Sequence, residues 1–141
     1  MLFGNVYLSD DKNGCALIIY PERKKANLKS VLLDFQLIFK TTGIANIKKA
    51  ITREAIIKQN HPKGLLCYLW FIGVAHSEQH KGTGSQLMNE IITEANIQKR
   101  IICLETSTLK NIPWYEKFGF TIYKELDFGY RLYCLKRDVP K

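Results

Sequence analysis

The residues best suited to chemistry lie in a short polar loop at positions 79–85, Gln-His-Lys-Gly-Thr-Gly-Ser. A β-prone apolar run, Leu65–Ala75, precedes this loop, and an amphipathic stretch, Thr83–Gln98, follows it. Small residues let a backbone approach a ligand closely, and the first N–H groups of a helix have no acceptor within that helix. The pattern therefore predicts a strand-to-helix junction that binds an anion such as a phosphate or a diphosphate.

Two well-known phosphate-binding loops do not fit these residues. The P-loop, GxxxxGK[ST], needs a Lys and a Ser or Thr after its second glycine, and no such pair stands at that distance. The dinucleotide fingerprint, GxGxxG, is met by Gly82 and Gly84, but Leu87 takes the third place. The pattern [Gln/Arg]-x-x-Gly-x-[Gly/Ala] is met at each defined position from Gln79 to Gly84.

Together with a second motif, this loop resembles the GNAT superfamily of acetyl-CoA-dependent N-acetyltransferases. The second motif is Asn111–Phe120, Asn-Ile-Pro-Trp-Tyr-Glu-Lys-Phe-Gly-Phe, which follows a short apolar strand. The resemblance covers roughly Tyr68–Lys136 and implies a mixed α/β (α+β) fold. In that fold the central parallel strands, here Tyr68–Ala75 and Ile101–Leu104, splay apart to admit the pantetheine arm of the cofactor.

The resemblance also implies roles for individual residues. Backbone groups of Ile72 and Val74 would bind pantetheine, and Asn111 would contact the same arm. Tyr115 matches the tyrosine that protonates the departing CoA thiolate, a role that suits a phenol with a pKa near 10. His80 stands where many relatives have glycine. The diphosphate would be held by the loop residues Gln79, His80, Lys81, Gly82, Thr83, Gly84 and Ser85.

A base is also needed, because an amine must be neutral to attack a thioester. Glu105 follows the apolar run Ile101–Leu104 and is the first candidate, with Glu78 and His76 as alternatives. Each choice has a structural alternative: His76 could be an exposed loop histidine, and Tyr115 could be a packing aromatic residue.

Composition excludes several other classes of protein. The 141 residues suit one domain, and 46% hydrophobic and 24% charged residues are globular values. The longest apolar runs are too short for a membrane span and no signal peptide is visible, so we expect a cytoplasmic protein. The four cysteines form no CxxC pair and have no close histidine, which argues against a metal site and favours buried, reduced thiols.

The elements that must position these motifs follow from hydrophobic periodicity. A helix between two consecutive central strands makes those strands parallel. The predicted strands are Phe3–Leu8, Cys15–Tyr20, Leu65–Ala75, Ile101–Leu104, Phe120–Leu126 and Tyr130–Lys136, and the predicted helices are Asn27–Phe39, Ile44–Asn60, Thr83–Gln98 and Asn111–Phe118.

The net charge of +8 is concentrated in one segment. Residues 22–63 carry 10 Lys or Arg against 3 Asp or Glu, a net of +7, so we expect a basic helical insert within a single domain spanning residues 1–141. Such a face is most often only solvated, although it could attract the cofactor's phosphates or an acidic acceptor. A nucleic-acid binder is a further alternative, but the sequence offers no stacking platform or base-reading motif.

GNAT proteins usually carry another strand and one or two helices before the hairpin that matches Phe3–Tyr20. Lacking that strand, Phe3–Leu8 would be an exposed sheet edge, so we expect a homo-oligomer that pairs through it. The sequence thus predicts an enzyme that moves an acetyl group from acetyl-CoA to a primary amine of a small molecule or peptide, without a metal or a membrane. A non-catalytic acyl-CoA-binding domain is the alternative.

Overall fold

The structure of the protein is a computed structural model that describes residues 4–23 and 44–140. It forms two compact units, residues 1–23 with 62–141, and residues 24–61. In the second unit, helix α2 (Ile44–Gln59) matches the predicted helix Ile44–Asn60. The predicted helix Asn27–Phe39 lies outside the described residues.

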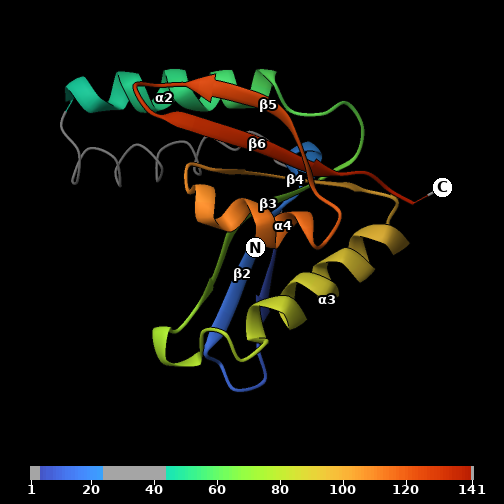
Figure 1. The fold of residues 1–141 in the computed structure, drawn as a ribbon. Coiled ribbons are helices and arrows are strands. Elements are labelled where there is room, and N and C mark those ends of the chain that lie inside the picture. Colours follow the sequence, from blue (N-terminus) through green and yellow to red (C-terminus); the bar gives the residue numbers. More distant parts are fainter. Residues whose placement is uncertain (1–3, 24–43, 141) are drawn as a thin grey trace. The chain divides into compact units, whose positions relative to one another are not determined.

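The first unit is built on a six-stranded mixed sheet with the order β1-β2-β3-β4-β6-β5 (Figure 1). Only β3 and β4 are parallel, as predicted. The last strand, β6, pairs with both β4 and β5 and so lies between them. The strands are β1 (Gly4–Leu8), β2 (Gly14–Ile19), β3 (Leu66–Val74), β4 (Ile101–Thr106), β5 (Thr121–Asp127) and β6 (Arg131–Arg137).

Two α-helices of this unit pack on one face of the sheet. Helix α3 (Thr83–Ile97) joins β3 to β4, and α4 (Ile112–Glu116) follows β4. Helix α4 is shorter than the predicted helix Asn111–Phe118 at both ends. Asn111 belongs to a 3-10 turn, η3 (Leu109–Asn111), and Lys117 and Phe118 lie in the turn that follows α4. The other 3-10 turns are η1 (Pro21–Arg23) and η2 (His76–Glu78).

The core forms where alternate strand side chains meet the apolar faces of these helices. Strand residues point to opposite faces in turn, so Cys67 and Leu69 of β3 reach the helices together with Ile102 and Leu104 of β4. From α3, the side chains of Leu87, Met88 and Ile91 are fully buried, as the helical spacing predicts. The core therefore fixes α3 against the two parallel strands.

One buried charge joins the end of α3 to the start of the parallel pair. Arg100 is only 6% exposed. Its guanidinium donates hydrogen bonds to the Glu22 carboxylate at 2.6 Å and to the Leu66 carbonyl at 3.0 Å. It also lies 4.5 Å from the centre of the Tyr20 ring. These contacts fix the end of the sheet at which β3 and β4 are paired.

Replacing this side chain tests its contribution to stability. Arg100→Ala should lower the free energy of unfolding by about 2 kcal/mol, because the buried Leu66 carbonyl loses its donor. Arg131→Ala is the matched control, since that ion pair with Glu125 is exposed and contributes at most about 0.5 kcal/mol. Urea unfolding measures both, and equal midpoints for the two variants would contradict the assignment.

Candidate active site

The predicted anion site lies at the start of α3, after a loop of residues 75–82 that we call the junction loop. Gly82 precedes the first helical residue with φ 93° and ψ −10°, and no side chain caps the helix. The first helical hydrogen bond runs from the Gln86 N–H to the Gly82 carbonyl at 2.9 Å. The N–H groups of residues 83–85 therefore have no acceptor within α3 and are available to an anion.

The space beside these N–H groups is open. A Cβ placed on Gly82 would meet nothing within 4 Å. One placed on Gly84 would make only ordinary contacts, 3.5 Å from Val74 and 3.6 Å from Trp114. The open space at Gly82 and the free N–H groups thus fit a diphosphate group.

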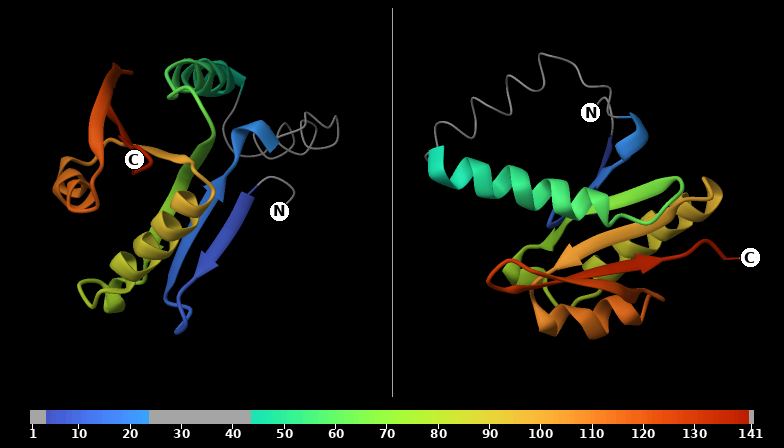
Figure 2. Two further views of the ribbon diagram at one scale, coloured as in Figure 1. Left: turned by 90° about the vertical axis from the view of Figure 1, so that its right-hand side faces the viewer. Right: turned by 90° about the horizontal axis from the view of Figure 1, so that it is seen from above.

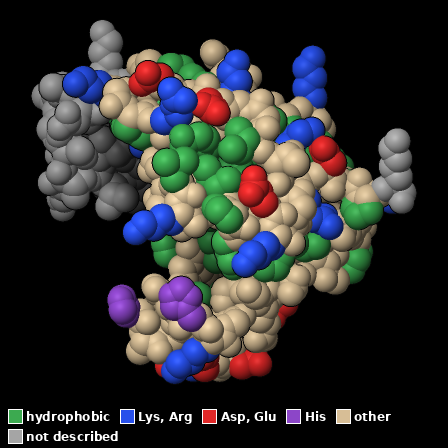
Figure 3. Space-filling model, in the orientation of Figure 1, with side chains coloured by type: hydrophobic (Ala, Val, Ile, Leu, Met, Phe, Trp, Pro, Cys, Tyr) green, Lys and Arg blue, Asp and Glu red, His purple; other side chains and the backbone are tan. Residues whose placement is uncertain are grey.

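The charged groups of the junction loop are arranged around this opening. The Lys81 ammonium lies 3.1 Å from the Glu78 carboxylate and is largely exposed. The Gln79 side chain donates to the Val74 carbonyl at 3.4 Å, which ties the loop to the end of β3. Histidine side chains gather over this loop in Figure 3. Lys81 is thus an exposed cation two residues before the first helical residue, Thr83.

The two parallel strands are separate along the part of β3 that leads to this junction. Their register contains three pairs, from Leu66↔Ile101 to Tyr68↔Cys103, although β3 continues to Val74 and β4 to Thr106. A bulge at Trp70 interrupts the pairing of β3 with β2 at the same level, and bulges bend a strand. Figure 2 shows the two halves of the sheet diverging. The expected splay is confirmed.

Two of the predicted cofactor-binding residues lie in the separated part of β3. Ile72 and Val74 pair with Ala16 and Gly14 of β2 on one side, and have no register partner in β4 on the other. Buried backbone groups need hydrogen-bond partners. The separated strand therefore presents its β4-facing N–H and C=O groups to an amide-bearing ligand.

Helix α4 brings Tyr115 towards the same junction. Its neighbour Trp114 contacts the start of α3, as the distance from Gly84 shows. The Tyr115 ring is 7% exposed and packs edge-on against Trp114 and Phe120, with centroids 5.0 and 5.8 Å away. Burial raises the pKa of Tyr115 above 10.0, so the hydroxyl is protonated at neutral pH and can act as a proton donor.

Of the candidate bases, His76 and Glu78 lie in the junction loop, and Glu105 lies elsewhere. Glu105 is inside β4, which extends two residues beyond its predicted end, and its carboxylate accepts a hydrogen bond from the Tyr68 hydroxyl at 2.7 Å. Because Leu104 belongs to the core, Glu105 points to the opposite face from Tyr115. His76 is exposed in η2, and Asn111 is exposed at the end of η3. The structure thus places Trp114, the neighbour of Tyr115, against the start of α3, and places Glu105 on the other face of the sheet.

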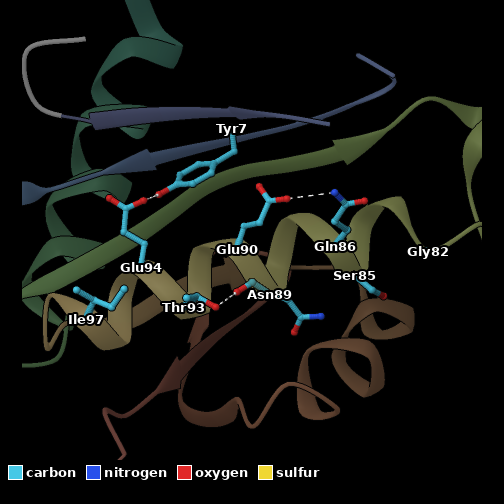
Figure 4. A pocket seen from close by; sticks show the side chains of 9 residues that line it. All are labelled: Tyr7, Gly82, Ser85, Gln86, Asn89, Glu90, Thr93, Glu94 and Ile97. Atoms are coloured by element: carbon cyan, nitrogen blue, oxygen red, sulfur yellow. Dashed lines mark hydrogen bonds between the residues drawn. The ribbon is translucent and has the colours of Figure 1, made fainter. Parts of the chain in front are cut away.

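A shallow hollow of about 910 Å³ beside α3 was not predicted from the sequence (Figure 4). It shares Gly82 and Ser85 with the predicted site and continues along α3 to Ile97. Tyr7 of β1 points across it, and its hydroxyl donates to Glu94 at 2.5 Å. Burial and this hydrogen bond raise the pKa of Tyr7. Gln86, Glu90 and Glu94 are four residues apart, so the sequence could have shown that they share one face of α3. It could not have shown that Tyr7 lies beside them, because that depends on the fold.

The buried cysteines are poor nucleophiles. Burial raises the pKa of Cys67 to about 12 and that of Cys134 to about 11, and it raises the pKa of Cys103 further. A thiol must ionise to attack a carbonyl or bind a metal. Within residues 4–23 and 44–140, no three His, Cys, Asp or Glu side chains are placed to share a metal ion.

The backbone of His80 provides a test of the junction loop. Its φ of 65° lies in the left-handed region, which is unfavourable for side chains branched at Cβ. His80→Val should lower the free energy of unfolding by about 1–2 kcal/mol, whereas His80→Gly should be nearly neutral. The control is Gln79→Val, at a residue with an ordinary φ of −63°. Urea unfolding decides, and equal tolerance of valine at both positions would refute the strained geometry.

Comparison with known proteins agrees with this geometry. Residues 40–122, more than half of the chain, match the family described as Acetyltransferase (GNAT) domain. A solved structure of histone acetyltransferase HPA2 and related acetyltransferase from Corynebacterium glutamicum is 20% identical, with a TM-score of 0.64. That alignment covers 99% of this chain and 67% of the other.

Two further structures share the fold. The NatC complex bound to Gag peptide and CoA is 14% identical over 93% of this chain and 64% of that one, with a TM-score of 0.56. Nourseothricin acetyltransferase is 15% identical over 96% and 64%, with a TM-score of 0.54. The chain spans 56% of the length of some other matched structures.

No helix among the described residues has the length and apolar character needed to cross a membrane. The match over residues 40–122 includes the junction loop, the separated parallel strands and the helix that carries Tyr115. The chain belongs to the GNAT superfamily of acetyltransferase domains.

Proposed function

We propose that this protein binds acetyl-CoA and transfers its acetyl group to a primary amine. Two features together support this most strongly. The part of β3 that leads to the junction loop is separated from β4, and the first N–H groups of the helix after that loop are free. A linear ligand with a diphosphate at one point and amides further along matches both features. Membership of the GNAT superfamily supports the same ligand.

The cofactor would lie along β3 with its diphosphate at α3. The N–H groups of Gly82, Thr83, Gly84 and Ser85 would bind the phosphate oxygens, with those of His80 and Lys81 alongside. Lys81 would exchange its contact with Glu78 for a phosphate oxygen, while Gln79 holds the loop to Val74. The backbone of Ile72 and Val74 would bind the pantetheine amides, and Asn111 would contact the same arm.

Acetyl-CoA supplies an activated thioester carbonyl. The neutral amine of the acceptor attacks that carbon, the C–S bond breaks, and the departing sulfur takes the phenolic proton of Tyr115. The proton lost by the amine would pass through water to Glu105, which faces away from Tyr115 and whose carboxylate accepts a hydrogen bond from Tyr68. The products are an N-acetylated amine and free coenzyme A, and Tyr115 regains a proton from water.

Tyr115→Phe tests this assignment. Loss of the proton donor should lower kcat by on the order of a hundredfold while the Kd for CoA stays the same. Because burial raises the pKa of Tyr115, the wild-type rate should not fall through loss of this proton below about pH 10. CoA release is measured with a panel of small amines and of peptides with a free α-amine, since the NatC structure holds a peptide and CoA.

The matched control is Tyr7→Phe, which removes a hydroxyl bound to Glu94 and should leave kcat unchanged. An unaltered kcat in Tyr115→Phe would remove the tyrosine from the mechanism. CoA binding by the wild type with no turnover on any amine would favour the alternative, a non-catalytic acyl-CoA-binding domain.

We also propose that two copies associate through β1. Among residues 4–23 and 44–140, this strand is the last in the sheet on its side, and its sequence Gly-Asn-Val-Tyr-Leu has no charged residue and no proline. Val6 and Leu8 are 52% and 58% exposed. The opposite edge strand, β5, carries Lys124, Glu125 and Asp127, which discourage pairing with another sheet. Antiparallel pairing of β1 with its copy would satisfy the free backbone groups of both edges.

Light scattering tests the association. The wild type should have twice the mass of the 16.3 kDa chain, and Val6→Lys should reduce it to that of one chain. Ile122→Lys is the matched control on β5, where the wild-type side chain is 39% exposed, and should leave the mass unchanged. A wild type that elutes as a single chain at micromolar concentration would count against the association.

The cytoplasmic location stays a prediction.

A further inference from the structure

Both ends of the junction loop are held by the turn between β1 and β2. The N–H of Ala75, the first residue of the loop, donates to the Asn13 carbonyl at 2.7 Å. Just after the other end of the loop, Thr83 lies directly against Gly14, the first residue of β2. Two adjacent residues of a distant hairpin therefore contact the start and the end of the segment that shapes the anion site.

The contact at Gly14 leaves no room for a side chain. A Cβ there would lie 2.8 Å from Thr83 Cγ2, 2.9 Å from Leu87 Cδ1 and 3.3 Å from Ser9 Oγ. Gly14 does not adopt a positive φ, so its backbone conformation is open to other residues. Position 14 therefore requires a residue without a side chain, because the first turn of α3 occupies the space that a side chain would fill.

The turn that carries Gly14 is internally fixed. The Gly14 N–H donates to Ser9 Oγ at 2.8 Å, and the Ser9 N–H donates to the Gly14 carbonyl at 2.9 Å. Asp11 accepts from the Asn13 N–H at 3.0 Å and from the Ser9 hydroxyl at 2.5 Å. Ser9 is itself 6% exposed. A methyl group at Gly14 would therefore displace α3 more readily than the turn.

We propose that Gly14 is a positioning residue of the anion site, because its lack of a side chain sets the place of the α3 N–H groups. The inference rests on the proposed function for the identity of the ligand. It does not rest on that function for the position of the α3 N–H groups. Gly14 acts through two side chains of α3, because a methyl group added there would meet Thr83 Cγ2 and Leu87 Cδ1.

The test combines Gly14→Ala with Thr83→Ser, which removes Cγ2 but keeps the N–H. Gly14→Ala should raise the Kd for CoA by on the order of tenfold and shift the backbone amide resonances of residues 83–85, since small misplacements of binding groups are costly. Gly14→Ala/Thr83→Ser should return both part of the way towards wild type, because Thr83 Cγ2 is removed while Leu87 Cδ1 remains. Thr83→Ser alone is the reference for the double variant. Asn13→Ala, which keeps the carbonyl that binds Ala75, is the control that should stay at wild-type values.

The amide resonances separate this inference from the proposed function. A wild type that takes up no CoA in calorimetry would overturn the function, and the resonances of residues 83–85 would still decide the role of Gly14. Resonances unchanged in Gly14→Ala, or shifted but not restored by Thr83→Ser, would overturn the inference. So would a Gly14→Ala protein that is unfolded, because Gly14 would then serve the packing of the whole unit.

Discussion

The site depends on the short pairing of β3 with β4. Parallel strands normally satisfy each other's backbone groups along their full length, and here they do so over three residue pairs. Beyond Tyr68, the β4-facing backbone groups of β3 need another partner. The bulge at Trp70 bends β3 where the pairing ends, and the buried Arg100 fixes the paired end. In the proposed complex, the pantetheine arm of the cofactor would supply that partner.

Burial determines the protonation states around the separated strands. It raises the pKa values of Tyr115 and of the thiols of Cys67, Cys103 and Cys134, so that all four groups keep their protons at neutral pH. The phenol is thereby suited to donate a proton, and the thiols are unsuited to attack. This combination favours direct transfer between two bound substrates over a covalent intermediate on cysteine. The same environment that stabilises the core thus favours one reaction course.

The sequence predicted the local elements well because their signals are local. The spacing of Leu87, Met88 and Ile91 places α3 to within one residue, and turn residues delimit both hairpins. The position of β6 between β4 and β5 depends on long-range pairing and has no such signal. Asn111 lies in a 3-10 turn and not in the predicted α-helix. Similarly, the side chain of Glu105 follows the alternation of β4 away from Tyr115, which the motif alone did not reveal.

The junction loop also shows why its sequence pattern is only part of the site. The glycines supply open space and a left-handed φ at Gly82, and His80 adopts a similar φ without being glycine. Such a conformation persists when the surroundings impose it. Around the junction loop, the Asn13 carbonyl binds the Ala75 N–H, and Gly14 and Trp114 lie against the first turn of α3. Because these contacts come from the β1–β2 hairpin and from α4, the anion site is a property of the folded unit, and the pattern at positions 79–84 covers only part of it.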